Sequence, residues 1–123
     1  MENPKYPKMN DIHQMIRATI PELEPIMQDA FIVGSFARDT QTPESDLDVA
    51  ILISENDLMT LLEELDMLDL DYLNTELINA RADTDICTWE GRPVDLQVFV
   101  DSDPRLKGYQ KIKLKASSQA RLG

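Results

Sequence analysis

The stretch AFIVGSFARDTQTPESDLDVAILI, residues 30–53, decides how this chain of 123 residues is expected to fold. It opens with a short apolar run, Ala30–Val33, which ends at Gly34 and is typical of a buried strand. A polar loop, Asp39–Ser45, leads to a second run, Asp46–Ile53, whose side chains alternate between an apolar and a mixed face. Two strands joined by a short polar connection are therefore predicted.

The second of these strands carries two carboxylates, Asp46 and Asp48, on the same face. Side chains two residues apart on a strand lie about 7 Å from each other, so both can reach one divalent cation or a pair of cations. Like charges placed in this way repel, and Mg²⁺ would neutralise them. Because Mg²⁺ usually completes its shell with water and substrate phosphates, the pair favours a nucleotide ligand, although exposed charges at the start of a strand are the simpler alternative.

The turn between the strands suggests where phosphates would bind. Gly34 lets the backbone approach a phosphate, and the residues after it can open a helix whose N–H groups face the same anion. Ser35 adds a hydroxyl donor, and Arg38 could reach a phosphate oxygen. Arg38 could equally pair with Asp39 or Glu44, so its role is left open.

A third carboxylate is expected on a neighbouring strand, because two metal ions held by three carboxylates can keep an attacking oxygen and a leaving pyrophosphate in line. The segments Thr84–Trp89 and Pro93–Val100 flank Glu90-Gly91-Arg92 and predict a hairpin. Asp95 lies in the apolar second arm, where an idle charge is costly. Asp85, on the first arm, is the alternative.

Two helices are predicted to pack on this sheet. Asn10 or Asp11 can cap the first, whose apolar residues keep helical spacing until Pro21. Ser54 caps the second, in which a leucine stripe is expected in the core: Leu58, Leu61, Leu62, Leu65 and Leu68. The expected class is α+β, a small mixed β-sheet with helices packed on one side. A single domain over residues 1–123 is expected, with a loose arm at 1–9 and a basic C-terminal tail at 104–123.

The net charge of -11 argues against a protein that grips nucleic acid, because that grip comes from clustered Lys and Arg. All 23 acidic residues lie at or before Asp103, whereas six of the 12 basic residues follow it. The tail is therefore either an edge strand protected by lysines or a basic patch for phosphates or an acidic partner. No apolar segment approaches the roughly 20 residues that span a bilayer, no secretory leader is evident, and the lone Cys87 cannot form an internal disulfide, so we expect a cytoplasmic location.

The motifs together resemble the DNA polymerase beta-like nucleotidyltransferase superfamily: Gly34-Ser35-Phe36-Ala37-Arg38, then Ser45-Asp46-Leu47-Asp48, then Asp95. The resemblance covers residues 31–100, and the short length is similar to that of the minimal nucleotidyltransferases, many of them prokaryotic antitoxins paired with HEPN-domain toxins. It implies that Asp46, Asp48 and Asp95 are catalytic metal ligands for two Mg²⁺ ions, with Asp95 also placed to activate the attacking hydroxyl. It implies a nucleotide-binding set for ATP: Gly34, Ser35, Arg38 and Ser45.

In the antitoxin branch, the resemblance implies transfer of AMP from ATP to a tyrosine of the HEPN toxin. Two alternatives remain: a binding module that neutralises a ribonuclease by occlusion, and a small-molecule nucleotidyltransferase of the antibiotic type. Asp39 departs from the family pattern, in which Gly is usual, so either a different path of the loop or a repulsion of phosphate is expected. The chain is also short for enclosing both substrates, so a partner protein or a second copy is expected to complete the site.

Overall fold

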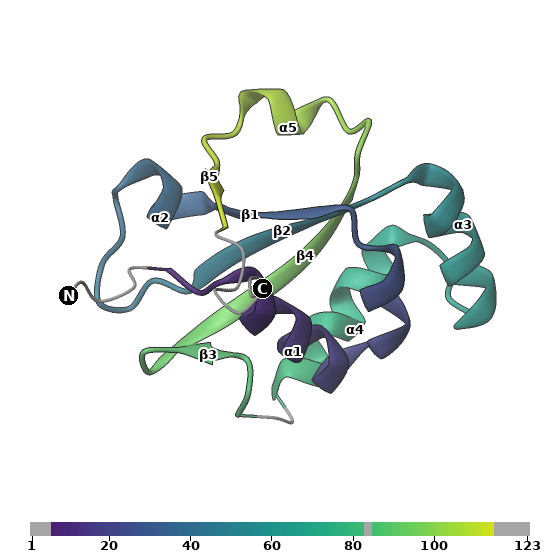
Figure 1. Ribbon diagram of the computed structural model, residues 1–123, viewed down its shortest axis with the longest axis horizontal. Helices are drawn as coiled ribbons and strands as arrows, with labels where there is room; N and C mark the ends of the chain where they lie inside the picture. Colours follow the sequence, from purple (N-terminus) through teal and green to yellow (C-terminus); the bar gives the residue numbers. More distant parts are fainter. Residues whose placement is uncertain (1–5, 83–84, 115–123) are drawn as a thin grey trace, which may run out of the picture.

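The computed structural model describes residues 6–82 and 85–114, which form a five-stranded sheet with helices packed against it (Figure 1). The strands are β1 (Asp29–Val33), β2 (Leu47–Ile53), β3 (Thr88–Trp89), β4 (Arg92–Val100) and β5 (Ile112–Lys113). The α-helices are α1 (Met9–Thr19), α2 (Gly34–Arg38), α3 (Glu55–Glu64), α4 (Leu70–Ala82) and α5 (Arg105–Gly108), and a 3₁₀ segment, η1, spans Pro21–Ile26. The expected α+β class is confirmed.

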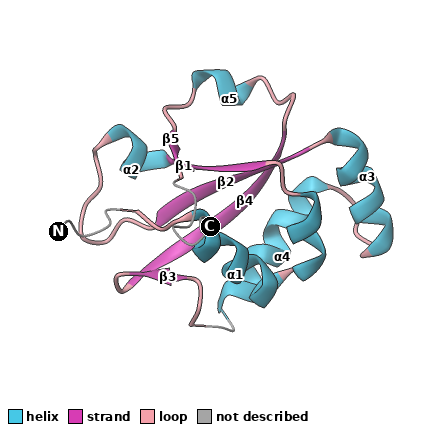
Figure 2. Cartoon of the chain, viewed as in Figure 1, coloured by secondary structure: helices cyan, strands magenta, loops and turns pink. Residues whose placement is uncertain are grey.

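The sheet is mixed, with the strand order β3-β4-β2-β1-β5. β2 and β4 are parallel, whereas the β1–β2, β1–β5 and β3–β4 pairs are antiparallel. Parallel neighbours need a long crossover, and here α3 and α4 supply it between β2 and β4 (Figure 2). This crossover makes β2 and β4 start at the same end of the sheet.

The main core lies between one face of the sheet and the helices α1, α3 and α4. Alternate residues of each central strand face these helices, as the sequence pattern predicts. Strand residues in this core include Ile32, Leu47, Val49, Ile51, Ile53, Val94, Leu96 and Val98. A smaller cluster on the other face joins Val33, Ala50, Phe99 and Leu106, the last from α5. The face with the smaller cluster is also the one that carries Asp48 and Asp95.

The start of α1 differs from the prediction. The helix begins at Met9 and its N-cap residue is Lys8, so neither Asn10 nor Asp11 is the cap. Asp11 acts from inside the first turn instead, because its carboxylate accepts a hydrogen bond from the backbone N–H of Lys8 at 2.8 Å. The predicted loose arm is therefore shorter than residues 1–9, since Tyr6 and Met9 pack against the core. Residues 1–5 lie outside the described part of the chain.

The leucine stripe after Ser54 is shorter than the sequence predicts. Ser54 does cap α3, accepting a hydrogen bond from the backbone N–H of Asp57 at 3.0 Å. The helix ends at Glu64, however, and the chain turns through Asp66, which has a positive φ of 55°. Helical spacing is lost beyond this turn, so Leu68 is 84% exposed instead of lying in the core.

Helix α4 was not predicted from the sequence. It buries Leu73 and Leu77, and the Asn74 side chain bonds to both backbone groups of Val98, donating to the carbonyl at 3.2 Å and accepting from the N–H at 2.7 Å. These bonds satisfy backbone groups of β4 beyond its short pairing with β3.

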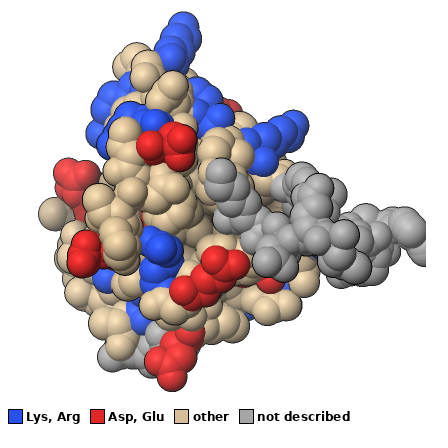
Figure 3. All heavy atoms as spheres, turned by 90° about the vertical axis from the view of Figure 1, so that its left-hand side faces the viewer, with Lys and Arg blue, Asp and Glu red and all other residues tan. Residues whose placement is uncertain are grey.

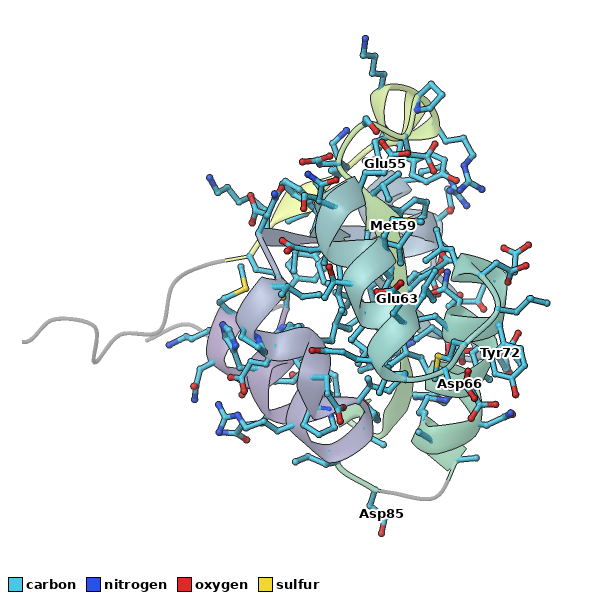
Figure 4. The ribbon with its side chains drawn as sticks, turned by 90° about the vertical axis from the view of Figure 1, so that its right-hand side faces the viewer. Glu55, Met59, Glu63, Asp66, Tyr72 and Asp85 are labelled. Carbon is cyan, nitrogen blue, oxygen red and sulfur yellow. The ribbon has the colours of Figure 1, made fainter. Side chains whose placement is uncertain are left out.

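The outer surface of α3 and the following turn is acidic, and Figure 4 shows Glu55, Glu63 and Asp66 there.

The hairpin and the tail agree in part with expectation. Glu90 and Gly91 both have positive φ, 52° and 82°, as a two-residue turn of type I′ requires. Of the predicted first arm, only the segment Thr88–Trp89 forms a strand, β3, and Thr84 lies outside the described residues.

In the tail, β5 pairs with β1 as an edge strand, and residues 115–123 lie outside the described range. None of the described helices is long and apolar enough to cross a membrane.

Candidate active site

The topology brings the predicted turn and carboxylates together at one end of the sheet. Asp48, near the start of β2, pairs on one side with Val33, the last residue of β1. On the other side it pairs with Asp95, near the start of β4. Neighbouring strands are about 4.8 Å apart, so the two carboxylates leave the sheet side by side. Gly34 follows Val33 directly, which puts the phosphate turn next to them.

Gly34 is required at this turn for two reasons. Its φ of 71° lies in the left-handed region, which residues with a Cβ adopt reluctantly. A Cβ at this position would also overlap the Asp48 carboxylate. The turn and the carboxylate are therefore packed against each other with no room for a larger residue.

The short helix α2 carries Ser35 in its first turn and Arg38 in its last. It ends at Asp39, whose φ of 59° and ψ of 38° are left-handed. The backbone N–H of Asp39 bonds to Phe36 O at 3.3 Å, and that of Thr40 bonds to Ser35 O at 2.9 Å. The chain thus keeps a left-handed helix end at the position where the family pattern has glycine, and Asp is among the residues that tolerate it.

Arg81, from the last turn of α4, lies among the carboxylates. Its Nη1 donates a hydrogen bond to Asp95 Oδ1 and lies 3.9 Å from Asp46 Oδ2. Sequence reasoning missed this residue. A signal was available, because Arg81 is the only basic residue between Arg38 and Arg92.

The electrostatics of the cluster favour a bound cation. Burial, followed by the nearby charges of Asp95 and Asp46, raises the pKa of Asp48 to about 6, while the Arg38 charge opposes the rise. Burial also raises the pKa of Asp95, even though the Arg81 charge acts in the opposite direction. Arg38 and Arg81 therefore leave the three carboxylates short of positive charge.

The donor set is that of a hard divalent cation, since all three side chains offer carboxylate oxygens. In the conformation seen, no three His, Cys, Asp or Glu side chains of residues 6–82 and 85–114 already surround one ion position. Asp95 is instead engaged by Arg81. The residues fit Mg²⁺ by chemistry, provided that Arg81 gives up this contact.

Arg92 holds the loop in front of β2. Its Nη1 donates to Ser45 O at 2.9 Å and to Thr42 O at 3.4 Å, and its guanidinium lies 4.9 Å from the ring centre of Phe36 in α2. Ser45 Oγ accepts a hydrogen bond from the Thr42 N–H at 2.8 Å, so its hydroxyl shapes the loop. Arg92 thereby links the phosphate turn to the residue before Asp46, which sequence reasoning did not foresee.

Asp85, the alternative third carboxylate, lies away from the cluster. It is exposed, and Figure 4 shows its side chain pointing away from the body of the protein. Asp95 is the one that pairs in register with Asp48.

Basic side chains gather on a different part of the same end of the molecule. Figure 3 shows Lys and Arg side chains concentrated toward the top, where α5 and β5 lie. Arg105, Lys107, Lys111 and Lys113 come from this segment, and Arg105 pairs with Asp103 at 2.6 Å. Arg105 also lies over the Phe99 ring, 5.3 Å from its centre.

Comparison with known proteins places the chain in a family. Residues 14–121 match the nucleotidyltransferase domain family, and because the match covers most of the chain, the protein belongs to that family and is a transferase by class. No curated protein matches it. Among solved structures, a crystal structure of a toxin-antitoxin with AMP-PNP is similar at 20% identity and a TM-score of 0.39, covering 90% of this chain and 75% of that one. That likeness is too loose to establish a shared fold.

Proposed function

We propose that this nucleotidyltransferase is metal-dependent and moves AMP from ATP to a tyrosine hydroxyl of a partner protein, an HEPN-type toxin that it silences as an antitoxin. The observation that carries the catalytic part is the register of Asp48 with Asp95, beside the glycine turn at Gly34. An occluding module would need neither the aligned carboxylates nor a glycine packed on one of them. The partner and the tyrosine rest on the resemblance of the motifs.

In the proposed reaction, the acceptor oxygen attacks the α-phosphorus of ATP, the bond to the β-phosphate bridging oxygen breaks, and pyrophosphate leaves with that electron pair. Asp95 takes the proton from the acceptor hydroxyl. The backbone N–H groups at Gly34 and Ser35 bind triphosphate oxygens, and Arg38 adds positive charge. Asp46, Asp48 and Asp95 would hold Mg²⁺, which supplies charge neutralisation for the leaving group.

The test uses ATP labelled at the α-phosphate, Mg²⁺ and the protein encoded in the neighbouring reading frame, chosen if it is short, helical and carries an Arg-x4-6-His motif. The neighbour should become labelled, whereas ATP labelled at the γ-phosphate should leave it unlabelled. The Asp46→Asn, Asp48→Asn double variant and Asp95→Asn should each abolish labelling. Asp85→Asn is the matched control and should label normally, because this carboxylate is exposed and points away from the body of the protein.

The alternative functions give different results. Full labelling by the double variant would refute the carboxylate mechanism. If the double variant protected cells from the toxin as well as the wild type does, occlusion would replace transfer as the function.

A further inference from the structure

Arg81 occupies part of the cluster that the proposed metal ions would need. Its Nη1 donates to one oxygen of Asp95 and lies 3.9 Å from one oxygen of Asp46. Its side chain is 24% exposed, less than either carboxylate partner, at 30% and 40%. The guanidinium is therefore partly buried among the carboxylates and does not merely contact them from solvent.

The position of Arg81 is fixed by the helix that carries it. Asn74, two turns earlier in α4, binds both backbone groups of Val98 in β4, and Leu77 is buried in the core between them. The end of α4 is thus tied to the strand that bears Asp95. In the described part of the chain, Arg81 is the only Lys or Arg that forms an ion pair with any of the three carboxylates.

A guanidinium and a divalent cation compete for these carboxylates. Mg²⁺ requires carboxylate oxygens at about 2.1 Å, with its remaining positions filled by water or phosphate, so an ion bound to these carboxylates lies close to the Arg81 guanidinium. Two positive groups this close together repel each other. Metal binding therefore weakens the contact between Arg81 and the carboxylates.

We propose that Arg81 is a built-in counter-ion that holds the Asp46–Asp95 cluster together in the metal-free protein and competes with the first divalent cation for it. Arg81 is a positioning residue and does not itself carry the reaction. The inference rests on the proposed function only in taking a divalent cation as the resident ion. Binding and stability test it without any nucleotide transfer.

The experiment compares the full chain with Arg81→Gln in the absence of nucleotide, using Mn²⁺ as the probe. Removal of the competing charge should tighten Mn²⁺ binding about tenfold, measured by electron paramagnetic resonance of free Mn²⁺. The variant should unfold at a lower temperature than the wild type in EDTA, and saturating Mn²⁺ should remove the difference. Arg81→Lys keeps the charge and should bind Mn²⁺ within about threefold of the wild type.

Arg17→Gln is the matched control, because it also breaks an arginine–carboxylate pair, with Glu24 at 3.0 Å, between α1 and η1, which carry none of the cluster residues. It should leave Mn²⁺ affinity unchanged. Equal or weaker Mn²⁺ binding by folded Arg81→Gln would overturn the proposal, as would failure of the variant to fold in both EDTA and Mn²⁺. Folding in Mn²⁺ alone would support it. Failure of these binding and stability effects would not contradict nucleotide transfer, so the two proposals can fail separately.

Discussion

Gly34 lies so close to Asp48 that no β-carbon fits between its backbone and the carboxylate. The same glycine has a positive φ of 71°, so both its conformation and its surroundings exclude a side chain. Any side chain at position 34 would consequently displace the Asp48 carboxylate. The structure therefore requires glycine at position 34 of the sequence motif.

Substitution of Gly34 by alanine should therefore reduce nucleotide transfer strongly. The left-handed backbone alone costs about 1 kcal/mol, and the overlap with Asp48 adds a displacement of the metal ligand, so we expect a loss of about 100-fold in initial rate. Gly91→Ala separates the two effects, because Gly91 has a φ of 82° but no atom within 4 Å of an added Cβ. Gly91→Ala should lower the stability of the protein but transfer nucleotide at a near-normal rate. Equal transfer rates for Gly34→Ala and Gly91→Ala would contradict a role for the overlap with Asp48.

The left-handed residue Asp39 gives an opposite prediction. Replacing it with glycine should raise the free energy of unfolding by up to about 1 kcal/mol, since glycine adopts this conformation without a steric penalty but loses more entropy on folding. Chemical denaturation would measure the change. Asp39→Ala keeps the steric penalty while removing the charge, so it should be no more stable than the wild type. A stabilised alanine variant would show that charge, and not backbone conformation, governs this position.

Much of the fold could be predicted because its signals are local. The strands around Gly34 and the cap at Ser54 follow from spacing and residue type alone. Helix α4 was missed because its apolar residues do not share one face, since Leu73 and Leu77 are buried whereas Tyr72 and Ile78 are exposed. Its anchor, Asn74, meets Val98 only after the crossover has formed. Leu68 was misplaced for a related reason, since the turn at Asp66 breaks a repeat that continues in the sequence.

The site shows the same division between local and long-range information. Asp46 and Asp48 could be predicted from their spacing, although β2 begins at Leu47 and Asp46 lies one residue before it. Asp95 could be predicted from its apolar surroundings. Arg81 and Arg92 carry no comparable pattern, because each reaches its partners from another element. Their contribution follows from packing of α4 on β4 and from the short β3–β4 turn.

Arg92 provides a test of loop positioning. Arg92→Ala should lower transfer about tenfold with a smaller fall in thermal stability, because it removes the bonds to Ser45 O and Thr42 O and the contact with Phe36. Arg92→Lys should restore part of the rate, since Lys keeps the charge but not the two-sided reach of guanidinium. Arg105→Ala, which also removes an arginine from an aromatic ring, is the control and should transfer normally. A normal rate for Arg92→Ala would remove Arg92 from the site.

The raised pKa of Asp48 predicts how stability depends on pH in the metal-free protein. With a pKa of about 6 in the folded state against an ordinary value of 3.8, the folded protein binds more protons between these pH values than the unfolded chain does. The free energy of unfolding should therefore fall as pH rises from 4 through 6, by about 1 to 2 kcal/mol after allowance for partial exposure. Denaturation in EDTA at a series of pH values measures this slope.

Asp48→Asn should flatten that slope, because the amide cannot ionise, and should leave the protein more stable than the wild type at pH 7. Saturating Mg²⁺ should also reverse the wild-type trend, since a bound cation favours the ionised carboxylate and the folded state together. Asp85→Asn, which alters an exposed carboxylate away from the cluster, should keep the wild-type slope. If the free energy of unfolding of Asp48→Asn fell with pH as steeply as that of the wild type, Asp48 would not be the group responsible for the slope.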